Sequence, residues 1–252
     1  MYMKKVFLTL AVLCAVAMMA GCKGGAANEN NTDRIPDAKS DTLWADGRGY
    51  WEIKTPYEEN GRTVLYRSCV FAGQEDGSVN EIDLSYYLLR RGTPAYDSSL
   101  NMMQSISAKH YVDEMASSGW VFEPNHTAVG NIPQHWYPVR KYKGAYYLYQ
   151  EGGCGIYFTD GVFIPVCGDY SAYRLKNVDV LSDGSYQFRY IGTNDSEETD
   201  TMKLVDKTTG LYRTTFDGIL EYYTTDDHLR KYDIIMLDGY PMVSVDDMKF
   251  DE

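Results

Sequence analysis

The sequence predicts a mainly β fold, an antiparallel meander that forms a barrel or a sandwich, together with one α-helix. Short runs of alternating apolar and polar residues fill most of the chain after residue 42. Turn-forming pairs separate many of these runs, for example Asp160-Gly161, Asp183-Gly184 and Asp217-Gly218. The 23 tyrosines outnumber the 8 phenylalanines and 4 tryptophans, and a tyrosine suits a half-exposed strand because its ring is apolar and its tip is polar.

The first strands are expected at Tyr50 to Lys54, Arg62 to Phe71 and Val79 to Leu89. The polar segment between the last two predicts a hairpin. The last segment alternates cleanly, which indicates one buried face. The apolar residues of that face are Ile82, Leu84, Tyr86 and Leu88.

One helix is expected over residues 98–118. Asp97 or Ser98 would cap its start, because short polar side chains accept hydrogen bonds from the first N–H groups of a helix. Gly119 follows its end, as is usual at a helix C-terminus. The apolar residues at helical spacing predict packing against the sheet; they are Leu100, Met103, Ile106, Tyr111 and Met115.

The second half of the chain reads as further antiparallel sheet without an internal repeat. The expected strands are Tyr173–Leu181, Tyr186–Ile191, Met202–Val205, Leu211–Phe216, Ile219–Thr224 and Tyr232–Leu237.

The segment from Cys154 to Cys167 predicts a hairpin with a defined register. If Asp160 and Gly161 form a two-residue turn, the numbers of opposed residues sum to 321, so Cys154 faces Cys167. That pair falls at a non-hydrogen-bonded position, where side chains approach most closely. We therefore expect a Cys154–Cys167 disulfide, with a metal or redox pair as the weaker alternative. Cys69 is expected to be a small buried core residue rather than a nucleophile.

The segment from Trp120 to Lys143 is the least regular part and is expected to be a surface loop that carries a binding site. Its candidate ligand-binding residues are His126, His135, Trp136 and Tyr137. Glu123 and the two histidines are potential metal ligands, but their spacing matches no known zinc pattern, so no metal is predicted.

The first 22 residues have the pattern of an export signal. Lys4 and Lys5 precede an apolar run, Val6 to Ala20, that is too short to cross a bilayer and ends in small residues. Met19-Ala20-Gly21-Cys22 resembles the lipobox of bacterial lipoproteins, although Met19 stands where leucine is the commonest residue. The resemblance implies a signal peptide over residues 1–21 and a lipid attached to Cys22.

The expected organisation follows from this resemblance and from composition. Residues 22–41 are polar and read as a flexible tether, and residues 42–252 form a mainly β globular domain, with a subdivision near residue 143 as the alternative. Because Lys23 rather than Asp follows Cys22, the resemblance implies an outer-membrane lipoprotein of the cell envelope, if the cell is Gram-negative. The membrane is then a partner through the lipid.

The function classes are limited by charge and by missing motifs. The net charge of −12 and the absence of a basic stripe exclude nucleic acid as a partner. The chain has no Gly-x-Ser-x-Gly, His-Glu-x-x-His or P-loop motif, and neither catalytic residues nor a cofactor are predicted. The favoured hypothesis is a lipid-anchored binding or accessory module for a glycan or peptide. The alternatives are an envelope hydrolase with a carboxylate-based site and a structural or assembly lipoprotein that binds an envelope protein.

Overall fold

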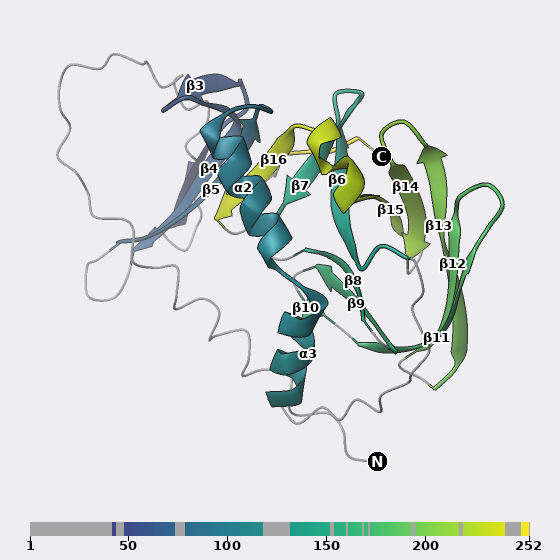
Figure 1. Cartoon of the computed structure of the whole chain (residues 1–252). Coiled ribbons are helices and arrows are strands. Elements are labelled where there is room, and N and C mark those ends of the chain that lie inside the picture. The colour runs from purple at the N-terminus through teal and green to yellow at the C-terminus, as the bar shows by residue number, and fades with distance from the viewer. Residues whose placement is uncertain are drawn as a thin grey trace. The chain divides into compact units, whose positions relative to one another are not determined.

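In the part of the chain that the computed structural model describes, the strands form one sheet of sixteen strands and the helices are few (Figure 1). The mainly β fold class is therefore confirmed. The structure describes residues 42–43, 48–73, 79–117, 132–151, 154–159, 161–167, 169–170, 172–192, 195–216, 219–239 and 248–251. All of them lie in one compact unit, 35–252.

The first five strands are β1 (Thr42–Leu43), β2 (Arg48–Ile53), β3 (Tyr57–Glu59), β4 (Arg62–Gly73) and β5 (Val79–Leu89). Three of them, β2, β4 and β5, agree with the predicted segments, whereas β1 and β3 were not predicted. β4 and β5 pair in a long antiparallel hairpin. Leu84, Tyr86 and Leu88 are buried as expected, but Tyr87 and Leu89 on the other face are buried as well. β5 is therefore covered on both faces.

The predicted helical segment forms two helices, α2 (Pro94–Ser105) and α3 (Ala108–Ser117). α2 begins at Pro94, earlier than expected, because Thr93 caps it by accepting a hydrogen bond from the N–H of Tyr96 (3.3 Å). The prediction of one continuous helix is wrong, since Ile106 has an extended backbone (φ −84°, ψ 133°) that ends α2.

Eight antiparallel strands pair in a closed ring, which is the barrel alternative of the prediction. We call it the strand ring; its order is β6–β15–β14–β13–β12–β11–β9–β8 and back to β6. The meander from β11 to β15 is confirmed. The members are β6 (His135–Tyr142), β8 (Gly155–Thr159), β9 (Val162–Cys167), β11 (Tyr173–Val180), β12 (Tyr186–Ile191), β13 (Glu197–Asp206), β14 (Leu211–Phe216) and β15 (Ile219–Thr225).

The remaining strands extend the sheet from β6 as an open arm, in the order β6–β7–β16–β5–β4–β2–β1. β7 (Ala145–Gln150) pairs antiparallel with β6, and β16 (Ile234–Gly239) pairs parallel with β7 and antiparallel with β5. β16 thus lies between β5 and β7, which both come much earlier in the chain. β10 (Asp169–Tyr170) pairs with β9, and the 3-10 helix η1 (Asp226–Lys231) follows β15.

The interior of the strand ring is filled mainly with aromatic side chains. Trp136 packs edge-on against Tyr186 and Tyr212, with ring centroids 5.3 and 4.8 Å away. Tyr190 keeps its polar tip paired, because its hydroxyl donates to Asp200 Oδ2 (2.6 Å). The tyrosines thus fill the interior of the strand ring with apolar atoms, while strand residues such as Asp200 accept hydrogen bonds from their hydroxyl groups. The buried residues of this cluster are Ile132, Trp136, Ile156, Phe158, Leu175, Phe188, Tyr190, Met202 and Tyr223.

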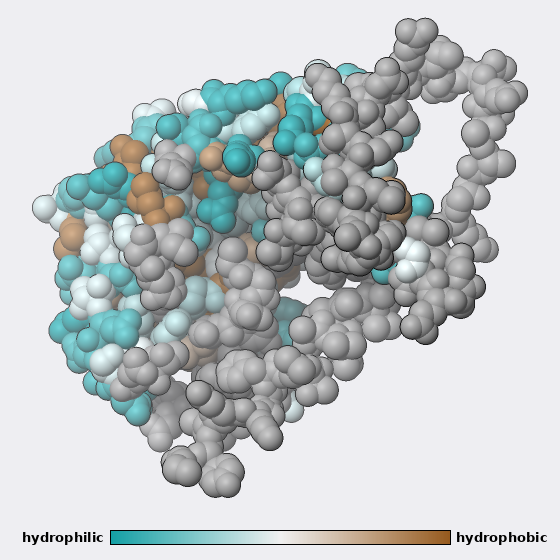
Figure 2. All heavy atoms as spheres, turned by 180° about the vertical axis from the view of Figure 1, so that it is seen from behind, coloured by the Kyte–Doolittle hydropathy of each residue, from teal (hydrophilic) through white to brown (hydrophobic). Residues whose placement is uncertain are grey.

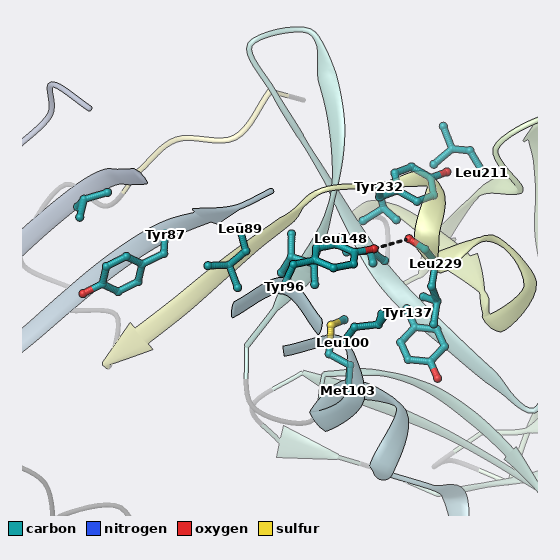
Figure 3. Packing of buried hydrophobic residues seen from close by; sticks show 13 residues of the cluster. Tyr87, Leu89, Tyr96, Leu100, Met103, Tyr137, Leu148, Leu211, Leu229 and Tyr232 are labelled. Carbon is teal, nitrogen blue, oxygen red and sulfur yellow. Dashed lines mark hydrogen bonds between the residues drawn. The ribbon is translucent and has the colours of Figure 1, made fainter. Parts of the chain in front are cut away.

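α2 covers one face of the open arm (Figure 3). Tyr96, Leu100 and Met103 of this helix are at most 5% exposed. The hydroxyl of Tyr96 donates to the backbone oxygen of Leu229 in η1 (3.4 Å; dashed line in Figure 3). α2 therefore ties the open arm to η1, next to the end of β15.

The C-terminal segment covers the opposite face of the open arm. The ring of Phe250 packs edge-on against Tyr86 and Tyr149, with centroids 5.9 and 5.3 Å apart. The carboxylate of Asp251 accepts hydrogen bonds from the backbone N–H groups of Lys143 and Gly144 (3.2 and 2.7 Å). These contacts hold the β6–β7 turn in place. The alternative prediction, a subdivision of the domain near residue 143, falls at this turn.

The predicted register of the β8–β9 hairpin is confirmed. Thr159 faces Val162, and the pairing continues outward to Gly155 and Val166. The next pair in this register is Cys154 and Cys167. No disulfide is found at the two cysteines whose side chains the structure describes, Cys69 and Cys154. The side chain of Cys167 lies outside those that the structure describes, so the Cys154–Cys167 disulfide is not observed and stays a prediction that rests on the confirmed register.

Peptide mapping, without reductant, of the protein from the producing cell should recover one cross-linked pair, Cys154 with Cys167. Reduction should then lower the free energy of unfolding by about 3 kcal/mol, because the bond closes a loop of about 14 residues. Cys69, at 4% exposed, should react only after unfolding and serves as the internal control. Recovery of Cys154 and Cys167 as free thiols would contradict the prediction.

Candidate functional site

β6 carries two different strands along one edge. β8 pairs with its first two residues and β7 with its last four. Trp136 is paired on both sides, with β15 and β8, and Val139 is paired on both sides, with β15 and β7. Tyr137 and Pro138 lie between these positions, where the sheet forks and none of the described strands pairs with that edge. Pro138 has no N–H to donate, which suits a gap in the pairing.

A small pocket lies at this fork. Its cavity volume is about 10 Å³, which is roughly the room that one water molecule needs. Its walls come from α2 and the residue after it, from β6, from the end of β7 and from the start of β8. The lining residues are Met103, Ile106, His135, Tyr137, Tyr149, Gln150, Glu151, Cys154 and Tyr157.

His135 is the central polar residue of the pocket. Its side chain lies between the rings of Tyr137 and Tyr157, with centroid distances of 3.6 and 4.1 Å. The residue is only 7% exposed, and its Nε2 atom is buried without a hydrogen-bond partner among the residues that the structure describes. Such an atom costs roughly 1–3 kcal/mol of folding free energy.

Gly155 keeps one side of the imidazole open. Its φ of +152° favours glycine, and a Cβ built there would lie 2.8 Å from the backbone oxygen of Trp136 and 3.0 Å from Nε2 of His135. Any other residue at position 155 would therefore crowd the unpartnered nitrogen.

Two other polar side chains of the pocket already have partners. The amide oxygen of Gln150 accepts a hydrogen bond from the hydroxyl of Ser99 on α2, and both residues are buried. The hydroxyl of Tyr137 donates to Asp226 Oδ1 (2.7 Å). Burial and this carboxylate raise the pKa of Tyr137, so its phenol stays protonated. Nε2 of His135 differs from these two groups, because it has no hydrogen-bond partner among the described residues.

Burial also fixes the charge of His135. It lowers the pKa of the imidazole from 6.5 to about 3. The ring is therefore neutral at pH 7, with one nitrogen that donates and one that accepts. The pocket thus offers an uncharged hydrogen-bonding group inside an aromatic wall.

The structure separates the predicted ligand-binding residues. His135 and Tyr137 line the pocket, whereas Trp136, 1% exposed, points into the strand ring and donates from Nε1 to the backbone oxygen of Pro133 (3.0 Å). His126 lies outside the described residues. The expectation of a surface loop is wrong for residues 135–142, which form β6. The cause is pairing with β15, β7 and β8, which buries these side chains.

The potential metal ligand Glu123 also lies outside the described residues. Within the ranges that the structure covers, no group of three His, Cys, Asp or Glu side chains could hold a metal ion.

The pocket does not have the carboxylate pair that the hydrolase alternative requires. Among its described lining residues Glu151 is the single carboxylate. Cys69 lies elsewhere, on β4, and is confirmed as a buried core residue, since it is 4% exposed and burial raises the pKa of its thiol to about 12.

The sequence argument missed Tyr157, Gln150 and Gly155 as site residues. Tyr157 could have been found, because the confirmed hairpin register turns it away from Ile156 and Phe158. The position of Gln150 depends on the fork between β7 and β8, and no local pattern in the sequence predicts that fork.

The assembly alternative predicts a flat apolar patch or an open sheet edge that binds the partner. On the face in Figure 2, apolar residues occur in small groups among hydrophilic ones. The exposed large apolar side chains belong to several separate elements; they are Met102, Val180, Leu181, Val205 and Leu220. None of the helices in the described ranges has both the length and the apolar character needed to cross a membrane.

No known protein family, no curated protein and no solved structure matches the chain. The function proposed below therefore depends on the residues of this chain alone.

Acid should destabilise the protein through His135. Because its pKa is about 3 when folded and 6.5 when unfolded, the unfolded state binds more protons between these values. Stability is then lost as pH falls, by up to about 1.4 kcal/mol per pH unit. His135→Phe should remove this dependence between pH 6.5 and 4.5, where most carboxylates remain ionised.

Urea unfolding of both proteins across this pH range measures the effect. His110→Gln is the matched control, because His110 is exposed on α3. Parallel pH profiles for the unsubstituted chain and His135→Phe would contradict the assignment of the buried neutral histidine.

Proposed function

We propose that the protein is a lipid-anchored lipoprotein of the cell envelope, held at the outer membrane, that acts as a binding or accessory module with the His135 pocket as its ligand site. The lipobox-like residues ending in Cys22 support the anchor. The tether of residues 22–41 would allow the globular domain to stand clear of the lipid headgroups.

The observation that carries the binding role is the unpartnered Nε2 of His135. A buried nitrogen without a partner destabilises the fold, whereas a phenyl ring would keep the stacking against Tyr137 and Tyr157. A polar atom kept at such a cost is typical of a functional site. Its natural partner is a ligand group that enters the pocket.

The enzyme alternative is an envelope hydrolase with a carboxylate-based site, but Glu151 is the single carboxylate among the described lining residues of the pocket. This favours binding over catalysis.

Native mass spectrometry of the full chain, extracted from membranes of the producing cell in mild detergent, tests both parts of the proposal. The protein should begin at Cys22 and carry acyl chains. A fraction should also carry an additional bound molecule, which should be absent from His135→Phe and present in the control His110→Gln.

An unprocessed chain without lipid would overturn the anchor. A lipidated protein whose bound mass is the same with and without His135, or which carries no bound mass, would overturn the ligand site.

A further inference from the structure

We infer that the pocket at the β6 fork binds one uncharged hydroxyl group of a glycan, which takes its place beside Nε2 of His135. This inference rests on the proposed function and names the chemical class of its ligand. It depends on the size, the charge and the hydrogen-bonding capacity of the pocket.

The size admits a single terminal heavy atom. A cavity of about 10 Å³ holds roughly one water molecule, and a hydroxyl that projects from a larger molecule replaces such a water. A backbone N–H does not fit in this way, because its nitrogen is flanked by carbon on both sides. A backbone carbonyl oxygen can only accept a hydrogen bond, so it matches one tautomer of His135, whereas a hydroxyl matches both. The partly exposed lining residues Ile106, Glu151 and Cys154 form the rim that would contact the rest of the ligand.

The charge of the pocket disfavours ionic ligands. The described lining has no lysine or arginine, and Glu151 is negatively charged, so an anionic group meets repulsion. A cation beside Nε2 meets the desolvation penalty that keeps His135 neutral, because burial lowers the pKa of this imidazole, although Glu151 at the rim attracts positive charge. An uncharged group is the one that the site accepts without a counter-ion.

A hydroxyl also matches the neutral imidazole in either tautomer. It donates to a bare Nε2 and accepts from a protonated one, so both forms of His135 gain a hydrogen bond. At the rim, the carboxylate of Glu151 is an acceptor for further hydroxyl groups of the same ligand. A glycan carries several hydroxyls on neighbouring carbons, which suits one buried and one rim contact.

Long-range nitrogen NMR of the detergent-solubilised full chain, labelled at histidine, tests this inference directly, because the chain has only 4 histidines. The probes are maltotetraose, cellotetraose and N-acetylated chitotetraose, against the deacetylated cationic form of chitotetraose and the anionic tetragalacturonate. At least one uncharged probe should shift the Nε2 resonance of His135 and leave that of His110 unchanged. Calorimetry should show about tenfold weaker binding to His135→Phe and unchanged binding to His110→Gln.

An unchanged His135 resonance with all three uncharged probes, as for a pocket that holds only water, would overturn the inference. So would a charged probe, or a blocked serine tripeptide, that shifts it as strongly as the uncharged glycans do. A His135-dependent bound mass in native spectrometry, combined with a negative glycan result, would leave the proposed function standing and remove only the glycan assignment.

Discussion

The pairing of β6 with three strands is the constraint on which the rest of the structure depends. β6 closes the strand ring through β8 and β15, and it also starts the open arm through β7. Since one edge of a strand can pair with only one neighbour at each position, β7 and β8 must separate around Tyr137 and Pro138. The pocket lies at this fork, and the stacked side chains of His135 and Tyr157 form part of its lining.

The composition of the chain fits this architecture. A ring of short antiparallel strands has a narrow interior, and aromatic rings fill it efficiently. Tyrosine serves this purpose where a hydrogen-bond acceptor is near, as Asp200 is for Tyr190 and Glu221 is for Tyr223. His135 differs from these residues, because its neighbours provide rings on both sides but no partner for Nε2.

The sequence predicted those features that depend on residues close together in the chain, such as the turn and the register of a hairpin. The two-residue turn sets the β8–β9 register directly, so the pairing of Thr159 with Val162 could be read from residue numbers alone. The division of the predicted helix at Ile106 could not be read from the sequence, because it depends on tertiary packing: α2 packs on the open arm, and α3 packs on β8 and β9. The three adjacent candidates His135, Trp136 and Tyr137 were found as a group, but strand alternation leaves only the first and third in the pocket.

The unfolding free energy of the full chain and of His135→Phe at pH 7.5, where the histidine is neutral in both states, tests the central claim most directly. If Nε2 has no partner within the protein, the phenylalanine variant should be as stable as the unsubstituted chain or more stable by up to about 2 kcal/mol. A loss of more than about 2 kcal/mol would show that His135 makes a structural hydrogen bond, and the pocket would then have no free polar group to offer a ligand.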